Sequence, residues 1–335
     1  MNYSHYLGID VSKKKLDLTL LDNEGELTHY LIGNNTESIE LLISKLEEKH
    51  SGFKLQSTLV CMEHTGTYTL PLRIYLYKEK ANVWMEAAIK INNSNQMRRG
   101  KTDKKDSQRI AIYASRYQND VVLWQPKREV IEELTELMNQ RERLLSGYSR
   151  LATPIKELNE MRVSAGLKEQ KSAYECTLKR MLADVKKIEK KMNLLIKSDE
   201  QCSRLIELTT SVPGVGIIVA LQIIIKSNEF KAISESKKFA CYAGVVPFEK
   251  SSGIHTGRGR VSHLANKKVK TALHMAAISN IAHNTEIQAY YERKVKEGKN
   301  KMSVINAIRN KIVKRIFACV RDNRLYEDSY MHSLA

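Results

Sequence analysis

The order of short strands and helices in the first 125 residues limits the possible folds more than any other feature of this sequence. Three short apolar segments occur between residues 4 and 32. The second alternates as Leu16, Leu18 and Leu20, and a polar Asp-Asn-Glu-Gly turn precedes the third. Period-two alternation and a polar turn predict strands, so we expect an antiparallel three-stranded meander.

Helices and strands alternate after this meander. Apolar residues recur at helical spacing from Ile39 to Leu46, and residues 57–62 are predicted to form a buried strand. A helix over about 70–80, a strand over about 82–87 and a helix from about 103 are expected next. The order β-β-β-α-β-α-β-α differs from a doubly wound βαβ repeat. It predicts an α/β ribonuclease-H-like (RuvC-like) domain over residues 1–125.

A heptad pattern distinguishes residues 126–203. Apolar residues follow a 4-3 spacing from Val130 to Leu158, broken only by Arg141, and a second such series runs from Leu178 to Leu195. This spacing predicts two long helices in an antiparallel coiled-coil arm, the first kinked or interrupted at Pro154. The alternative is a pair of ordinary bundle helices, because about three heptads is close to the minimum for a coiled coil.

Residues 204–335 are expected to form a mostly α-helical C-terminal domain. Residues 212–216, Val-Pro-Gly-Val-Gly, lie between apolar helical stretches and resemble a helix-hairpin-helix turn, although a structural helix corner fits equally. Residues 244–262 contain four glycines and are predicted to be a loop. An alanine-rich helix and a basic helical tail from about 285 follow.

Charge and composition indicate the class of partner. The 335 residues include 55 Lys and Arg against 38 Asp and Glu, a net charge of +17, which favours a polyanion such as nucleic acid. Hydrophobic residues make up 42% of the chain, which excludes a wholly disordered protein. No apolar run of about 18 residues and no secretory signal occurs, so we expect a cytoplasmic protein and no membrane partner. Five scattered cysteines argue against a disulfide framework and a structural zinc site.

Four carboxylates are candidates for a metal site. Asp10 and Glu63 end predicted strands, and Asp103 and Asp106 are one helical turn apart on a single face. Magnesium prefers oxygen ligands, and two ions about 4 Å apart can hold the attacking and leaving oxygens of a phosphodiester. Each acid alone could equally be a surface charge, with Thr102 as the N-cap of a helix whose first turn favours acids.

A second candidate lies between Lys250 and His263, where Ser252 precedes Gly253 in a segment rich in Arg and His. Serine needs activation to act as a nucleophile, and neighbouring cations could stabilise charge on an attacked phosphate. Alternatively, the segment is a flexible basic loop that contacts backbone phosphates without chemistry.

Together these strings resemble the DEDD insertion-sequence transposases of the IS110 family, which includes the Piv-type DNA invertases. The resemblance spans nearly the whole chain. Its N-terminal part rests on Gly-Ile-Asp-Val-Ser-Lys at 8–13, Glu-x-Thr-Gly-x-Tyr at 63–68 and Lys-Thr-Asp-x-x-Asp at 101–106. Its C-terminal part rests on Pro-Gly-Val-Gly at 213–216, Tyr-Ala-Gly-Val-Val-Pro at 242–247 and the following Ser-Gly.

The resemblance implies that Asp10, Glu63, Asp103 and Asp106 hold Mg²⁺ and that Ser252 attacks a DNA phosphate to give a phosphoserine. It also implies double-stranded donor and target DNA, a structured bridge RNA, and a homo-oligomer from dimer to tetramer. A bacterial or archaeal protein associated with the nucleoid is implied as well. The sequence departs from the family after Ser262, because His263 and Ala265 precede Asn266 where the family usually shows Lys and then Gly. Ser251 and Ser262 are less favoured nucleophiles, and no roles are assigned to His255 and His263.

Three other functions fit parts of the sequence. A Holliday-junction-type endonuclease would use the four acids and water to hydrolyse DNA. A noncatalytic nucleic-acid-binding protein would need only the charge. An actin-like sugar kinase would share Gly-Ile-Asp at 8–10, but the chain lacks the later glycine motifs of that class.

Overall fold

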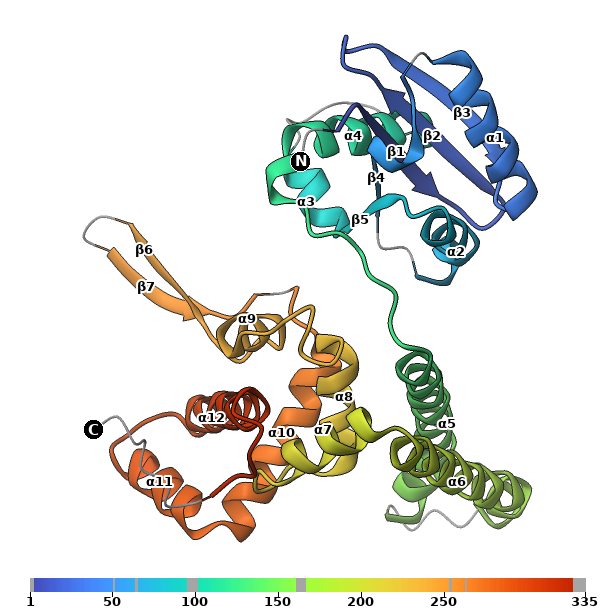
Figure 1. Cartoon of the computed structure of the whole chain (residues 1–335). Coiled ribbons are helices and arrows are strands. Elements are labelled where there is room, and N and C mark those ends of the chain that lie inside the picture. Colours follow the sequence, from blue (N-terminus) through green and yellow to red (C-terminus); the bar gives the residue numbers. More distant parts are fainter. Residues whose placement is uncertain are drawn as a thin grey trace. The chain divides into compact units, whose positions relative to one another are not determined.

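The computed structural model describes residues 3–50, 52–63, 66–94, 102–160, 167–252, 255–262 and 264–327. Residue contacts divide the chain into two compact units, Met1–Pro126 and Lys127–Ala335. Each unit is described by itself below (Figure 1). No helix among the described residues is long and apolar enough to cross a membrane.

The N-terminal unit contains a five-stranded mixed sheet in the order β3-β2-β1-β4-β5. The strands are β1 (His5–Val11), β2 (Lys15–Leu21), β3 (Leu27–Gly33), β4 (Thr58–Glu63) and β5 (Asn82–Glu86). β2 is antiparallel to β1 and β3, whereas β4 is parallel to both β1 and β5. The predicted meander and the predicted order of strands along the chain are therefore confirmed, and this sheet is consistent with a ribonuclease-H-like domain.

Helices cover both faces of this sheet. The helices are α1 (Thr36–Lys49), α2 (Leu70–Lys78), α3 (Ala88–Asn93) and α4 (Asp103–Arg116), and 3-10 turns lie at Leu55–Ser57, Gly66–Thr69 and Gln118–Asp120. One apolar core joins α1 and α2 to Leu7 and Ile9 of β1. The other joins α3 and α4 to Tyr6 of β1 and to Leu59 and Cys61 of β4. Alternate residues of each central strand therefore contact opposite helical layers.

The C-terminal unit begins with two long helices, α5 (Glu129–Glu160) and α6 (Leu167–Ser198). They are antiparallel, since Lys191 near the end of α6 pairs with Glu133 near the start of α5 at 2.7 Å. Apolar residues near this end, such as Leu134 and Met192, belong to the core of the whole unit, as in a helical bundle. α5 continues through Pro154, so the helix is not interrupted there, and the alternative of a kink at Pro154 stays a prediction. A supercoiled arm over 126–203 stays a prediction.

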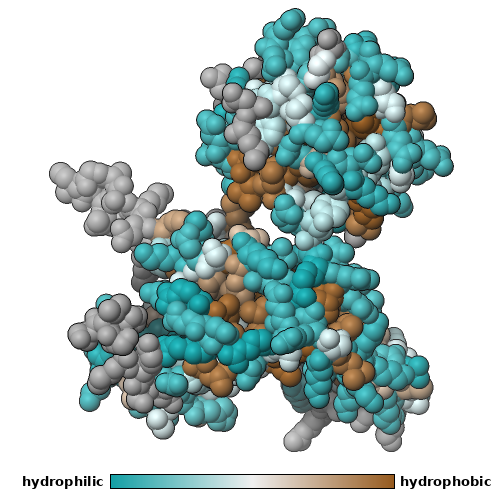
Figure 2. Space-filling view, in the orientation of Figure 1, coloured by the Kyte–Doolittle hydropathy of each residue, from teal (hydrophilic) through white to brown (hydrophobic). Residues whose placement is uncertain are grey.

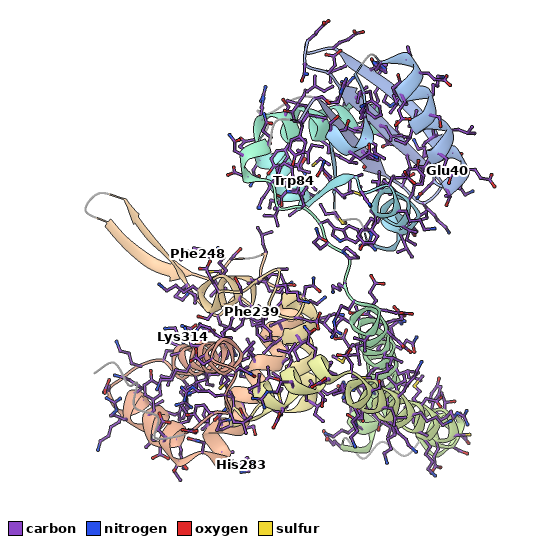
Figure 3. The ribbon with its side chains drawn as sticks, viewed as in Figure 1. Glu40, Trp84, Phe239, Phe248, His283 and Lys314 are labelled. Atoms are coloured by element: carbon purple, nitrogen blue, oxygen red, sulfur yellow. The ribbon has the colours of Figure 1, made fainter. Side chains whose placement is uncertain are left out.

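The remaining helices form the rest of this unit and bury one apolar core. They are α7 (Glu200–Thr210), α8 (Ile217–Ser227), α9 (Ser236–Tyr242), α10 (Lys267–His283), α11 (Thr285–Lys296) and α12 (Lys301–Arg321). Phe239 of α9 is fully buried in this core and is labelled in Figure 3. Hydrophilic residues cover much of the visible surface, including the helical unit (Figure 2).

The predicted loop over 244–262 is wrong, because this segment contains the hairpin strands β6 (Phe248–Ser252) and β7 (His255–Arg260). Figure 1 shows the hairpin extending from the helices of its unit. Both strands are mostly polar and β7 contains two glycines, so they lack the apolar alternation by which half-buried strands are found in a sequence. They form by pairing with each other instead.

Candidate functional site

Asp10 and Glu63 follow a pair of residues that are neighbours in the sheet. Ile9 of β1 pairs with Met62 of β4 in parallel register, and both side chains belong to the core beneath α1 and α2. Because side chains alternate along a strand, Asp10 and Glu63 lie on the other face, which α4 covers. Adjacent strands are about 4.8 Å apart, so the sheet brings these two acids next to each other.

The start of α4 lies over the same face of the sheet. Thr102 is its N-cap and accepts a hydrogen bond from the Lys105 amide, as predicted, and Asp103 and Asp106 occupy its first turn. One residue further, the hydroxyl groups of Ser107 and Thr19 form a fully buried hydrogen bond of 2.8 Å. This bond joins α4, just after its first turn, to β2, the strand beside β1.

Gly8 permits the close approach of α4. A Cβ atom at Gly8 would lie 2.2 Å from the Ala111 nitrogen and 2.4 Å from the Ser107 carbonyl oxygen. Only a residue without a side chain fits beneath the α4 backbone at this point. The glycine two residues before Asp10 therefore determines how near α4 comes to the sheet at Ser107 and Ala111.

Asp103 and Asp106 each form an ion pair with a basic side chain. Lys15 Nζ lies 2.7 Å from an Asp103 carboxylate oxygen, and this hydrogen bond raises the pKa of Lys15. Arg109 Nη1 lies 2.8 Å from Asp106 in an i,i+3 pair. Among the described residues, no three His, Cys, Asp or Glu side chains gather in a way that could hold a metal.

The donor set nevertheless fits magnesium chemically. Carboxylate oxygens are the ligands that Mg²⁺ prefers, and Lys15 and Arg109 already supply positive charge to two of the acids. Metal binding at all four acids would require these two side chains to release Asp103 and Asp106.

Sequence reasoning missed two further acids on the same face. Asp17 pairs with Asp10 across β1 and β2, is 5% exposed, and lies 3.0 Å from His29 Nε2. Glu86 pairs with Glu63 across β4 and β5, and it is buried. The alternation of side chains along a strand puts both acids on this face. Their burial depends on how α4 packs against the sheet, which the sequence does not predict.

The buried carboxylate of Glu86 has hydrogen-bond partners within its own unit. Its carboxylate accepts hydrogen bonds from the Ala87 amide at 2.8 Å and from Lys90 at 3.0 Å. Burial, followed by the charge of Glu86, raises the pKa of Tyr113 on α4 to about 12. These contacts explain Glu86 as a link between β5 and the helices that cover it.

Ser252 is the last residue of β6. It pairs with His255 of β7, and Ser251 pairs with Thr256. Gly253 and His263 lie outside the described residues, as do the side chains of Ser251, Ser252 and His255. The structure thus assigns Ser252 to the tip of a hairpin. Ser262, in contrast, accepts a hydrogen bond from the Leu264 amide in the following turn.

The root of the hairpin is held by close packing and side-chain hydrogen bonds. Gly244 has φ +66°, and a Cβ atom there would lie 2.4 Å from the Ala265 Cβ. Asn266 donates to the Tyr242 hydroxyl at 2.8 Å and caps α10 through the Val269 amide. Ala265, where the family usually has glycine, therefore fits against a residue that lacks a side chain.

The turn at residues 212–216 packs against α10. Gly214 has φ +75°, and a Cβ atom there would lie 2.6 Å from the Ala276 carbonyl oxygen. Asn280 of α10 also donates a hydrogen bond to the Pro213 carbonyl. These contacts support the structural helix corner that the sequence left open.

Comparisons with known proteins cover both units. Residues 7–158 match a family model described as "Transposase", of the DEDD IS110 type, and residues 206–292 match the model "Transposase IS116/IS110/IS902 family". The "Pilin gene-inverting protein" of Moraxella bovis is 24% identical over 326 residues, which is 96% of this chain and 97% of that protein. The protein of the same name from Moraxella lacunata is also 24% identical, over 340 residues, with the same coverage. The "Transposase for insertion sequence element IS1111A" of Coxiella burnetii is 24% identical over 223 residues, 53% of this chain and 60% of its own length.

Proposed function

Because this chain belongs to the IS116/IS110/IS902 family of transposases, which cut and rejoin DNA, we propose that it exchanges DNA strands with a Mg²⁺-binding carboxylate group and a serine nucleophile. The carboxylates are Asp10, Glu63, Asp103 and Asp106, and the nucleophile is Ser252. We assign them to a RuvC-like domain over 1–125 and a transposase domain over 204–335, with an arm over 126–203 between.

One observation carries the carboxylate assignment. Asp10 and Glu63 are on adjacent parallel strands, on the face covered by α4, and the first turn of α4 contains Asp103 and Asp106. These acids come from three separate segments of the chain. A set of unrelated surface charges would not be expected on one face of one sheet.

The serine reaction is a pair of transesterifications. The Ser252 Oγ forms a bond to the DNA phosphorus, the bond from phosphorus to one strand's sugar oxygen breaks, and the serine proton passes to that oxygen. A sugar hydroxyl of the partner strand then attacks the phosphoserine, and its proton returns to Oγ. Mg²⁺, when bound, would stabilise negative charge on the phosphate oxygens. Asp10, Glu63, Asp103 and Asp106 would hold the ion.

The Ser252→Ala variant tests the nucleophile. It should lose both strand exchange and the covalent protein–DNA adduct that denaturing gels detect with a nicked substrate. Ser251→Ala, on the same strand of the hairpin, is the matched control and should keep both. An adduct formed by Ser252→Ala would contradict the assignment, and free hydrolysed ends in place of joined products would favour the endonuclease alternative.

The Asp10→Asn variant tests the metal site. It should weaken Mg²⁺ binding in calorimetric titration and abolish strand exchange, whereas Glu24→Gln, an exposed acid in the β2–β3 turn, should change neither. Unchanged recombination by Asp10→Asn in magnesium would remove the proposed metal site.

We also propose a bridge RNA that pairs with double-stranded donor and target DNA, and a dimer to tetramer as the active form. The test is to purify the protein from cells that express its own element and to sequence the RNA bound to it. Recombination should then depend on that RNA, and light scattering should give more than one chain per particle. Recombination that proceeds equally well without RNA would contradict the proposal of a bridge RNA.

A further inference from the structure

Arg309 of α12 is a buried cation without an acidic partner in the described part of the chain. It is 5% exposed, and burial lowers its pKa. Its Nη2 donates to Nδ1 of His274, and its Nη1 lies 3.3 Å from the Asn306 side-chain oxygen. Its Nε is buried and has no hydrogen-bond partner. Because arginine only donates, Nδ1 of His274 must be the acceptor.

The same unit shows how a guanidinium group is normally neutralised. Arg128 pairs with Asp199 at 2.7 Å and with the buried Glu229 at 2.6 Å. Arg309 has a neutral imidazole and an amide oxygen instead. A buried charge that lacks an opposite charge is costly, so a stable core position would favour an apolar residue here. The unmet donor therefore points to an anion supplied from outside this chain.

The surroundings favour a phosphate group. A planar guanidinium binds phosphate through two parallel hydrogen bonds. His274 and Asn306 are only partly buried, so the edge of the guanidinium lies close below the surface between α10 and α12. Lys270 precedes His274 by one turn on the same face of α10 and adds positive charge there.

We propose that Arg309, His274 and Asn306 form a binding site for a phosphate of the DNA backbone. The phosphate would replace His274 as the acceptor for Arg309. Asn306 also donates to the Val245 carbonyl at 2.7 Å, three residues before β6 begins. Phosphate binding would therefore act on the root of the hairpin that carries Ser252. The assignment of the phosphate to DNA rests on the proposed function. The phosphate site itself does not.

Inorganic phosphate is the first probe, used with the full chain and compared with chloride at equal ionic strength. Phosphate should raise the Tm of the wild type, and Arg309→Met should show no such rise while its own Tm is equal or higher. Arg321→Met, which removes an exposed arginine paired with Asp322, is the control and should keep the response. A phosphate response retained by Arg309→Met, or a lower Tm of that variant without phosphate, would overturn the proposal.

A second variant tests the site while Arg309 stays in place. His274→Glu supplies a carboxylate where Arg309 now meets a neutral ring, so it should raise the Tm and abolish the phosphate response. A His274→Glu variant that responds to phosphate like the wild type would contradict the site.

The salt dependence of DNA binding tests whether the bound phosphate belongs to the DNA backbone. The slope of log Kd against log salt for a duplex oligonucleotide should fall by about 0.9 in Arg309→Met, the value for one phosphate contact. Ser252→Ala should leave this slope unchanged, so failure of the serine chemistry is separable from failure of the phosphate site. An unchanged slope in Arg309→Met would refute the DNA assignment.

Discussion

At the scale of single residues, Gly8 controls the candidate carboxylate site most directly. Gly8→Ala would place a methyl group against the α4 backbone, 2.2 Å from the Ala111 nitrogen. Because backbone cannot move as a side-chain tip can, we expect a loss of about 3 kcal/mol in the free energy of unfolding. Both tryptophans, Trp84 and Trp124, lie in the N-terminal unit, so selectively excited tryptophan fluorescence during urea unfolding reports on that unit alone.

Gly25→Ala is the matched control for this prediction. Gly25 has φ +88° with no atom near its missing Cβ, so alanine there is strained without a collision. Gly25→Ala should lower the free energy of unfolding by about 1 kcal/mol. Equal losses for the two variants would mean that the contact of Gly8 with α4 is not tight.

A second prediction at this scale concerns the contribution of Arg128 to the free energy of unfolding. Arg128→Met leaves Glu229, with 1% of its side chain exposed, buried without its main partner, and we expect a loss of about 3 kcal/mol in the free energy of unfolding. Thermal unfolding followed by circular dichroism measures it. Lys231→Met removes an exposed partner of the same carboxylate and should cost under about 1 kcal/mol. Similar losses in both variants would contradict this ranking.

The same arginine predicts a pH dependence. Its hydrogen bonds hold the pKa of Asp199 below the ordinary value. Since the folded pKa is depressed, Asp199 stabilises the fold above its ordinary pKa, and this stability is lost as pH falls through the folded value. Arg128→Met should therefore show a smaller loss of stability below about pH 4 than the wild type. Parallel stability curves in acid would exclude this pair as the cause.

At the scale of elements, the root of the β6–β7 hairpin depends on one close contact. Gly244→Ala should lower the Tm, because its methyl group would meet Ala265 at 2.4 Å and its φ of +66° is strained for alanine. Adding Ala265→Gly should restore the steric part and leave about 1 kcal/mol of backbone strain. Additive effects of the two substitutions, measured by thermal unfolding, would show that the residues do not collide.

At the scale of the whole molecule, the net charge of +17 should dominate binding to DNA. If about six phosphates are contacted, affinity should fall by roughly 10³ between 50 and 200 mM salt. Fluorescence anisotropy with a labelled duplex measures this fall. A flat response would mean that the excess positive charge does not face the nucleic acid.

The sequence by itself determined the meander, the alternation of helices and strands in the first unit, the N-cap at Thr102 and the apolar faces of α5 and α6. These features depend on the spacing of residues within short segments, where side-chain direction repeats with a fixed period. The polar β6–β7 hairpin escaped prediction because each strand is stabilised mainly by pairing with the other.

Only the tertiary structure decided which residues share a surface. α4 packs against Gly8, and this buries Asp17 and Glu86 beside the predicted acids Asp10 and Glu63. The sequence contains 38 acids, so it likewise could not predict that Arg309 lies apart from every described carboxylate. Burial and charge pairing are set by contacts between distant segments, and such contacts leave no period in the sequence.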